Sequence, residues 1–365
     1  MGFASTETSS ISSLQRADHI LIRITGAVVK ARSAEDVSTT LKEAQKYGIQ
    51  IAVGAGGHGT NGTSSTDGGI LIDVTPMNKV TVDVENKTAT AGGGARWEEV
   101  DVGLGNAGLA TVGGRVNNTG IGGLTLGGGY GWLSSKHGLV VDNLISAEVV
   151  LADGRIVTAS SRKNPDLFRA IRGAGQCFGL TTKFVFQAHD LDYPVWAGQL
   201  IIKHDRYKAV VAFINEFLQK VNGEASMTCA CATAPISGFI CSLFYDGPRD
   251  KAEQFYAPLL ALEPVLNTTG MMPYCEVNSM TNKNVPWGSN RILRGTTFVP
   301  PLSIEFMETM MQSTQAYRAN LVDNEALPPS TFMFELTDNR VIQKVPHEAM
   351  SFANRGPQCH TMLFL

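Results

Sequence analysis

The sequence predicts an α+β protein built from two domains. In the first half, short apolar runs typical of strands alternate with helical repeats, and 22 of the 38 glycines fall between Gly54 and Gly131. From Val195 onwards, strand patterns follow one another with long amphipathic helices between them. A chain of 365 residues is too long for one small core. We therefore assign residues 1–192 to a first domain and residues 193–365 to a second.

The first domain is predicted to begin with a strand at 26–31 and a helix after Ser33. Ser33 and Asp36 have the spacing of a capping box, and apolar residues then recur at helical spacing until Gly48. A short buried strand follows, ending at Val53. Further strands are predicted at 69–73, 79–83, 88–91, 145–151, 156–159 and 180–187, with helices at 96–108 and from 164 onwards.

The second domain reads as an antiparallel sheet with long helices on one face. The strands are predicted at 195–202, 225–232, 238–245, 331–335, 340–345 and 359–365, and the helices at 207–221, 249–262 and 302–321.

Composition excludes several classes of function. A net charge of −3 gives no reason to expect nucleic acid or a membrane surface as a partner, and no run of about 18 apolar residues predicts a spanning helix. The first residues show no secretory signal, so a cytoplasmic location is expected. The six cysteines lack metal-ligand spacing, and no metal is expected. Cys229 and Cys231 share one strand face and are expected to be buried, reduced thiols.

A glycine run with one histidine follows the strand that ends at Val53. Backbone N–H groups can turn toward an anion where side chains are absent, so Gly54–Gly62 suits the pyrophosphate of a dinucleotide. His58 lies within this run, close enough to bond a ring system of the same ligand. The run also matches the Rossmann fingerprint G-x-G-x-x-G, but Thr60–Thr63 is a poor helix start and no acidic residue follows at the expected place.

Two further glycine-rich segments must be explained together with the first. They are residues 111–123 (TVGGRVNNTGIGG) and 124–139 (LTLGGGYGWLSSKHGL). The three segments resemble the FAD-binding domain of the vanillyl-alcohol-oxidase (PCMH-type) superfamily. Asn164–Phe168 and Phe178-Gly179 also match that family, in the same order along the chain. Within it they are most similar to the berberine-bridge-enzyme-like branch, and the match runs from about residue 27 to 187. The resemblance implies a first domain of two α/β subdomains followed by a substrate-binding domain.

The resemblance also implies a flavin site. The backbone of residues 56–60 and 111–124 would hold FAD, and His58 occupies the position at which relatives bond the 8α-methyl carbon of the flavin. Many relatives carry a second link through cysteine, where this sequence has Val116, so a single covalent bond is expected. The remaining implied cofactor contacts are Gly54, Gly56, Gly57, Gly59, Thr60, Thr111, Asn117, Ile121, Gly123, Leu124, Gly127 and Leu180. Ordinary turn chemistry is the alternative for Thr111 and Asn117.

The implied reaction is oxidation of a C–O or C–N bond in a small hydrophobic molecule by hydride transfer to covalent flavin, within secondary metabolism. An oxidase is favoured over a dehydrogenase, but oxygen and another electron acceptor both stay open, as does the oligomeric state. Tyr130 is the catalytic candidate, as a base or a hydrogen-bond donor, with a packed aromatic as the alternative. His137 and Asp142-Asn143 are expected to be structural, and Lys136 to be a surface residue.

Relatives continue beyond the segment that resembles Phe352–Arg355 and deliver a Tyr-x-Asn segment to the flavin. The sequence given ends at Leu365, so that segment, and with it the usual catalytic tyrosine, is expected to be absent. This keeps a second interpretation open, in which the fold is a catalytically degenerate flavoprotein or a non-redox binding scaffold.

Overall fold

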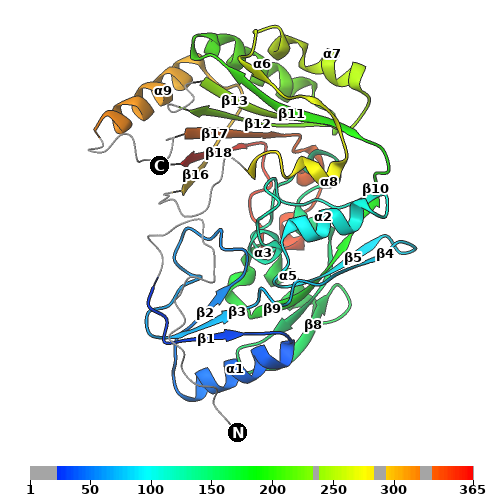
Figure 1. Cartoon of the computed structure of the whole chain (residues 1–365), viewed down its shortest axis with the longest axis vertical. Helices are drawn as coiled ribbons and strands as arrows, with labels where there is room; N and C mark the ends of the chain where they lie inside the picture. Colours follow the sequence, from blue (N-terminus) through cyan, green and yellow to red (C-terminus); the bar gives the residue numbers. More distant parts are fainter. Residues whose placement is uncertain (1–22, 233–237, 283–292, 321–330, 365) are drawn as a thin grey trace.

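The computed structural model describes residues 23–232, 238–282, 293–320 and 331–364. Figure 1 shows a three-stranded and a five-stranded sheet at one end of the molecule and an eight-stranded sheet at the other. Helices α2 (Trp97–Gly105), α3 (Ile121–Leu126) and α8 (Tyr274–Val277) lie between them (Figure 1). The first strand along the chain to join the eight-stranded sheet begins at Val195. The division of the chain into domains after residue 192 stays a prediction.

The three-stranded sheet is parallel and carries one helix. Its members are β1 (Ala27–Lys30), β3 (Ile70–Asp73) and β2 (Ile51–Gly54), in spatial order, with α1 (Ala34–Lys46) packed on it. The predicted capping box is confirmed, because Asp36 N donates to Ser33 Oγ (3.1 Å) and Ser33 N donates to the Asp36 carboxylate (3.2 Å). The helix buries Val37, Leu41 and Ala44 as its apolar spacing predicts.

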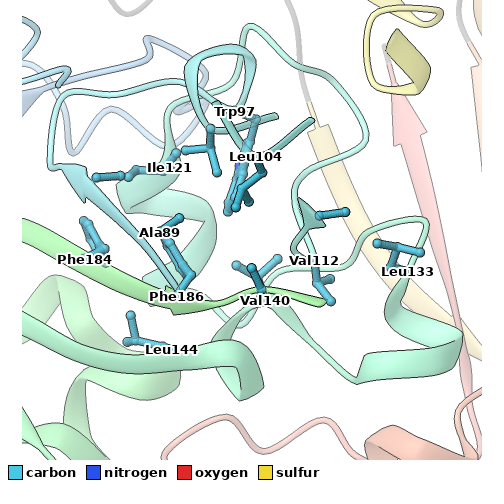
Figure 2. Close-up of a cluster of buried hydrophobic side chains, with 14 of the residues drawn as sticks. Ala89, Trp97, Leu104, Val112, Ile121, Leu133, Val140, Leu144, Phe184 and Phe186 are labelled. Atoms are coloured by element: carbon cyan, nitrogen blue, oxygen red, sulfur yellow. The ribbon is translucent and has the colours of Figure 1, made fainter. Parts of the chain in front are cut away.

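The five-stranded sheet is antiparallel and supports the largest core of the first domain. In spatial order its strands are β4 (Val80–Asp83), β5 (Thr88–Gly92), β9 (Leu180–Gln187), β7 (Leu144–Val150) and β8 (Ile156–Ser160). Phe184 and Phe186 rise from β9 and pack with Trp97 and Ile121 under the helices (Figure 2). The short elements β6 (Leu109–Ala110), α4 (Ser134–His137), a 3₁₀ turn at Val140–Asn143, α5 (Pro165–Ala174) and β10 (His189–Asp190) complete this half.

Every pairing in the eight-stranded sheet is antiparallel, as predicted. Its spatial order is β14 (Leu266–Asn267), β11 (Val195–Ile202), β13 (Gly238–Tyr245), β12 (Ala225–Ala232), β17 (Thr331–Thr337), β18 (Cys359–Phe364) and β16 (Leu293–Phe298), with β15 (Gly270–Met272) also on β11. The helices α6 (Tyr207–Lys220), α7 (Arg249–Leu260) and α9 (Ile304–Ala319) cover one face (Figure 1).

Strand alternation gives the two faces of this sheet different roles. Phe332, Phe334 and Leu336 point into the core under the helices, together with Cys229 and Cys231. The intervening residues therefore face the first domain. Cys229 and Cys231 are buried and free, as the sequence analysis expected.

One predicted strand is wrong. Residues 340–345 were expected to be extended, but Arg340–Gln343 form the short helix α10. The carboxylate of Asp338 accepts hydrogen bonds from the backbone N–H and the guanidinium of Arg340, and this local bonding turns the chain at the end of β17. Ile342 then packs with Leu139 and Val141 of the first domain. The apolar residue that suggested a strand is therefore buried from a helix instead. Leu365, at the end of the last predicted strand, lies outside the described residues.

The segment between β17 and β18, residues 338–358, connects the second domain to the first, and we call it the strap. Arg172 of α5 donates to Ala349 O, and the backbone N–H of Ser351 and of Phe352 donates to Arg172 O. The same segment also forms a buried ion pair between Arg355 and Asp142, 2.6 Å apart, with side chains that are 1% and 9% exposed. Asp142 therefore holds this strap as well as forming the expected turn before β7.

Arg355→Ala should destabilise the protein by about 3 kcal/mol, because it leaves the Asp142 carboxylate buried without its cation. The matched control is Arg155→Ala, which removes a solvent-exposed pair with Asp153 and should cost much less than Arg355→Ala. Urea unfolding of the flavin-loaded protein measures both. Equal costs for the two variants would contradict a stabilising role for the strap.

Candidate active site

Two loops of the first domain meet at a backbone contact between Gly56 and Gly120. A Cβ added to Gly56 would lie 2.1 Å from Gly120 N, and one added to Gly120 would lie 2.7 Å from Gly56 N. No other residue fits at either position. The loop of residues 54–62 after β2 and the loop of residues 111–120 before α3 therefore approach as closely as backbones can.

This contact brings His58 of the first loop beside Asn118 of the second. His58 Nε2 lies 2.8 Å from Asn118 Oδ1, in a half-buried environment. The carboxamide oxygen can only accept, so the hydrogen bond requires a proton on Nε2. His58 could be predicted from the glycine run, but Asn118 could not, because residues 60 positions apart give no sequence signal of contact.

A cavity of about 750 Å³ opens along these two loops, a size typical of cofactor sites. Eight of the predicted cofactor residues line it: Gly56, Gly57, His58, Gly59, Thr60, Gly123, Leu124 and Leu180. The lining also includes Gln176, Cys177 and Thr181, which were not among the predicted site residues.

The lining is suited to a dinucleotide held without cations. Among the lining residues that the structure describes, none is Lys, Arg, Asp or Glu. Gly57 has a left-handed φ of 72°, and a left-handed residue beside a right-handed one can turn consecutive N–H groups toward one point. A pyrophosphate would therefore be held by backbone N–H groups and hydroxyls, so the residues present fit FAD.

The other five predicted cofactor residues do not line the cavity. Gly54 ends β2, and Gly127 caps the C-terminal end of α3. Thr111 donates to Gln187 O (2.7 Å), Asn117 Oδ1 accepts from Asn282 (2.6 Å), and Ile121 is fully buried in the core. Thr111 and Asn117 thus make ordinary turn and loop contacts, which was the alternative interpretation to cofactor binding.

Tyr130 also lies outside the cavity lining, four residues beyond the end of α3. Its hydroxyl is 2.7 Å from His360 Nε2 on β18, and Asn354 Nδ2 is 3.1 Å from the same nitrogen. The Asn354 amide nitrogen can only donate, so Nε2 acts as the acceptor and the tyrosine hydroxyl donates to it. Burial, followed by the nearby Glu335 charge, raises the pKa of Tyr130.

Glu335 and His360 stand directly opposite each other on β17 and β18. Among the described residues of β12, β17 and β18, they are the ionisable side chains on the face toward the first domain. Burial lowers the pKa of His360, and the Glu335 charge acts in the opposite direction. Neither residue could be predicted from the sequence, since each is an isolated polar residue in a strand more than 200 positions from Tyr130.

Arg115 connects the same face to the first domain. Its guanidinium donates to Thr337 Oγ1 (2.9 Å) and lies over the Trp132 ring, 4.6 Å from the ring centroid. Burial lowers the pKa of Arg115, while the Glu335 carboxylate acts to raise it. Arg115, Tyr130, Glu335 and His360 thus form one electrostatically coupled group between the domains, which we call the interdomain cluster.

His137 and Lys136 form contacts that are structural, as expected for His137. The His137 ring stacks on His189 at 3.7 Å between centroids, and burial with the neighbouring His189 lowers the pKa of His137 to about 4. Lys136 pairs with Asp246 of the second domain at 2.6 Å, so it is more than a surface residue.

In the part of the chain that the structure describes, no helix combines the length and apolar character needed to cross a membrane. Within the same ranges, no three His, Cys, Asp or Glu side chains gather closely enough to hold a metal ion.

Comparison with known proteins shows the family of the chain. Residues 25–160 match the family model described as an FAD binding domain. The chain is 34% identical over 355 residues to the FAD-linked oxidoreductase pgmH of Aspergillus terreus, covering 94% of this chain and 71% of that protein. The chain belongs to the FAD-linked oxidoreductase family. Its cofactor is FAD, and its fold and enzyme class are those that the sequence resemblance implied.

Solved structures confirm the fold. The berberine-bridge-enzyme-like protein 1 of Physcomitrella patens matches with a TM-score of 0.77 and 24% identity, covering 92% of this chain and 75% of that one. Glucooligosaccharide oxidase of Acremonium strictum matches with a TM-score of 0.79 and 22% identity, covering 96% and 76%. The latter carries a 6-S-cysteinyl, 8α-N1-histidyl FAD. The predicted PCMH-type FAD-binding fold is therefore confirmed.

Gly120→Ala should reduce the FAD content of purified protein by about tenfold or more, because the added Cβ forces the two loops apart. Gly270→Ala on β15 is the matched control, since a Cβ there meets nothing within 4 Å. Flavin absorbance per mole of polypeptide measures both. Full FAD content in Gly120→Ala would refute the loop contact as a condition for binding.

Proposed function

We propose that this protein oxidises a C–O or C–N bond of a small hydrophobic molecule, with a flavin covalently attached to His58 and oxygen as the acceptor. The observation that carries the proposal is the position of His58 on the glycine-lined wall of the FAD cavity. A role in secondary metabolism is part of the proposal.

The residues of the cavity would hold FAD from both sides. The backbone of residues 56–60 and the start of α3 would contact the pyrophosphate and the flavin, with Leu180 toward the adenine. When bound, FAD supplies an acceptor for a hydride from the substrate carbon. His58 would fix the ring position by its covalent bond.

The interdomain cluster would remove the substrate proton. Burial keeps the Tyr130 phenol protonated and His360 neutral, so Tyr130 Oη can accept a substrate proton only as its own passes to His360 Nε2. The resulting imidazolium would be stabilised by Glu335, directly opposite on β17. Tyr130 thus keeps its predicted catalytic role as one member of a relay.

The composition of the sheet face around Glu335 and His360 favours an uncharged, largely apolar substrate. Around Glu335 and His360 the residues that share this face are Thr228, Ala230, Met333 and Met362. Methionines adapt to irregular apolar groups, and the carboxylate and imidazole offer acceptors for one hydroxyl or amine.

A non-redox scaffold is the competing proposal. The two are separated by mixing the purified, flavin-loaded protein with a panel of hydrophobic alcohols and amines under anaerobic conditions. The oxidase proposal expects at least one compound to bleach the flavin absorbance near 450 nm, and hydrogen peroxide to appear when oxygen is readmitted. A loaded protein that no member of a broad panel bleaches would favour the scaffold.

Tyr130→Phe should lower kcat by about 100-fold or more with the bleaching substrate, because the proton path through Oη is lost. Tyr193→Phe is the matched control, since it also removes a hydrogen-bonded hydroxyl, here to Asp246, outside the cluster. Steady-state oxygen consumption measures both. An unchanged kcat in Tyr130→Phe would exclude the proposed relay.

Glu335→Gln should move the acid limb of the kcat/KM profile to lower pH. Activity requires neutral His360, so kcat/KM falls as pH drops through the pKa of that ring. Glu335 acts to raise this pKa, and its removal lowers it. Glu253→Gln on the exposed surface of α7 is the control and should leave the limb in place. A limb that moves to higher pH would contradict the assignment.

A further inference from the structure

We propose that Asn118 is the positioning residue for flavin attachment, because it fixes the tautomer and the orientation of the His58 ring. This inference rests on the proposed covalent bond between His58 and FAD.

The hydrogen bond determines which ring nitrogen reacts. Asn118 Oδ1 accepts from His58 Nε2 at 2.8 Å, so the proton of the neutral imidazole resides on Nε2. An imidazole protonated at Nε2 carries its nucleophilic electron pair on Nδ1. The bond to the 8α carbon should therefore form at Nδ1, with Nε2 held by Asn118 throughout.

The loop around Asn118 is fixed well enough to orient a partner. Asn117 N donates to Asn278 O (3.0 Å) of the second domain, and Thr119 N donates to Val116 O (3.1 Å). The Gly56–Gly120 contact lies two residues away on both loops. Asn118 Oδ1 thus presents a fixed acceptor to a histidine in an otherwise glycine-rich loop.

The attachment reaction balances with dioxygen as the co-reactant. A C–H bond of the 8α-methyl group breaks, and the bond from that carbon to Nδ1 forms. The methyl proton is transferred to the ring system, which is thereby reduced by two electrons, and the attached imidazole keeps its proton on Nε2 as an imidazolium. Dioxygen takes up these two electrons, the proton on the ring system and one proton from solvent, and leaves as hydrogen peroxide, so the attached flavin is again oxidised.

Asn118 should accelerate this reaction through charge as well as geometry. Attack through Nδ1 places positive charge on the ring, and a hydrogen bond from Nε2–H to a carboxamide oxygen stabilises that charge. Loss of one hydrogen bond to a charged group should slow the reaction by roughly tenfold to a hundredfold.

The experiment uses full-length apoprotein made in a riboflavin-starved host and mixed with saturating FAD in aerated buffer. Acid-stable flavin is followed over time for the wild type, Asn118→Leu, Asn118→Asp, His58→Ala and Asn86→Leu. Asn86 lies exposed in the turn between β4 and β5 and controls for the Asn-to-Leu change. Quenching of FAD fluorescence measures noncovalent binding in the same samples.

The expected result is normal noncovalent binding but attachment at least about tenfold slower in Asn118→Leu, with the wild-type rate in Asn86→Leu. Asn118→Asp should restore attachment and move its acid limb to higher pH, because a carboxylate favours the protonated ring. Wild-type attachment in Asn118→Leu, or a loss explained wholly by weaker noncovalent binding, would overturn the inference. Acid-stable flavin on His58→Ala would instead refute attachment at His58, and the inference with it.

Discussion

The contact between Gly56 and Gly120 is the constraint on which the cofactor site depends. Two backbones can approach this closely only where neither carries a side chain, so one pair of glycines sets the distance between the two loops. His58 and Asn118 then meet across the gap at 2.8 Å, and α3 begins where its backbone lines the cavity. The glycine enrichment therefore allows the two loops to pack closely, and it also leaves space for the phosphates of the cofactor.

The substrate side depends on contacts between the domains. The strap after β17 is anchored by the buried Arg355–Asp142 pair, and β18 follows it with His360 facing Tyr130. Arg115 reaches from the first domain to Thr337 on β17. These contacts hold the eight-stranded sheet over the flavin domain, so the group that would move a proton exists only when the two halves are assembled.

Much of the fold and half of the site could be predicted from the sequence. Local signals sufficed for the capped helix after Ser33, for the antiparallel second domain and for the glycine loop with His58. Asn118, Glu335 and His360 escaped because their roles arise from contacts between residues far apart in sequence. The strand expected at 340–345 failed for a local reason, since Asp338 bonds to Arg340 and turns the chain.

The most direct test of the central claim is the absorbance spectrum of purified protein before and after acid precipitation. The claim predicts a flavin spectrum in the native protein and a yellow pellet after acid, because a bond through His58 survives denaturation. A colourless pellet with all flavin in the supernatant would contradict covalent attachment. A native protein with no flavin bands would contradict the assignment of the cavity.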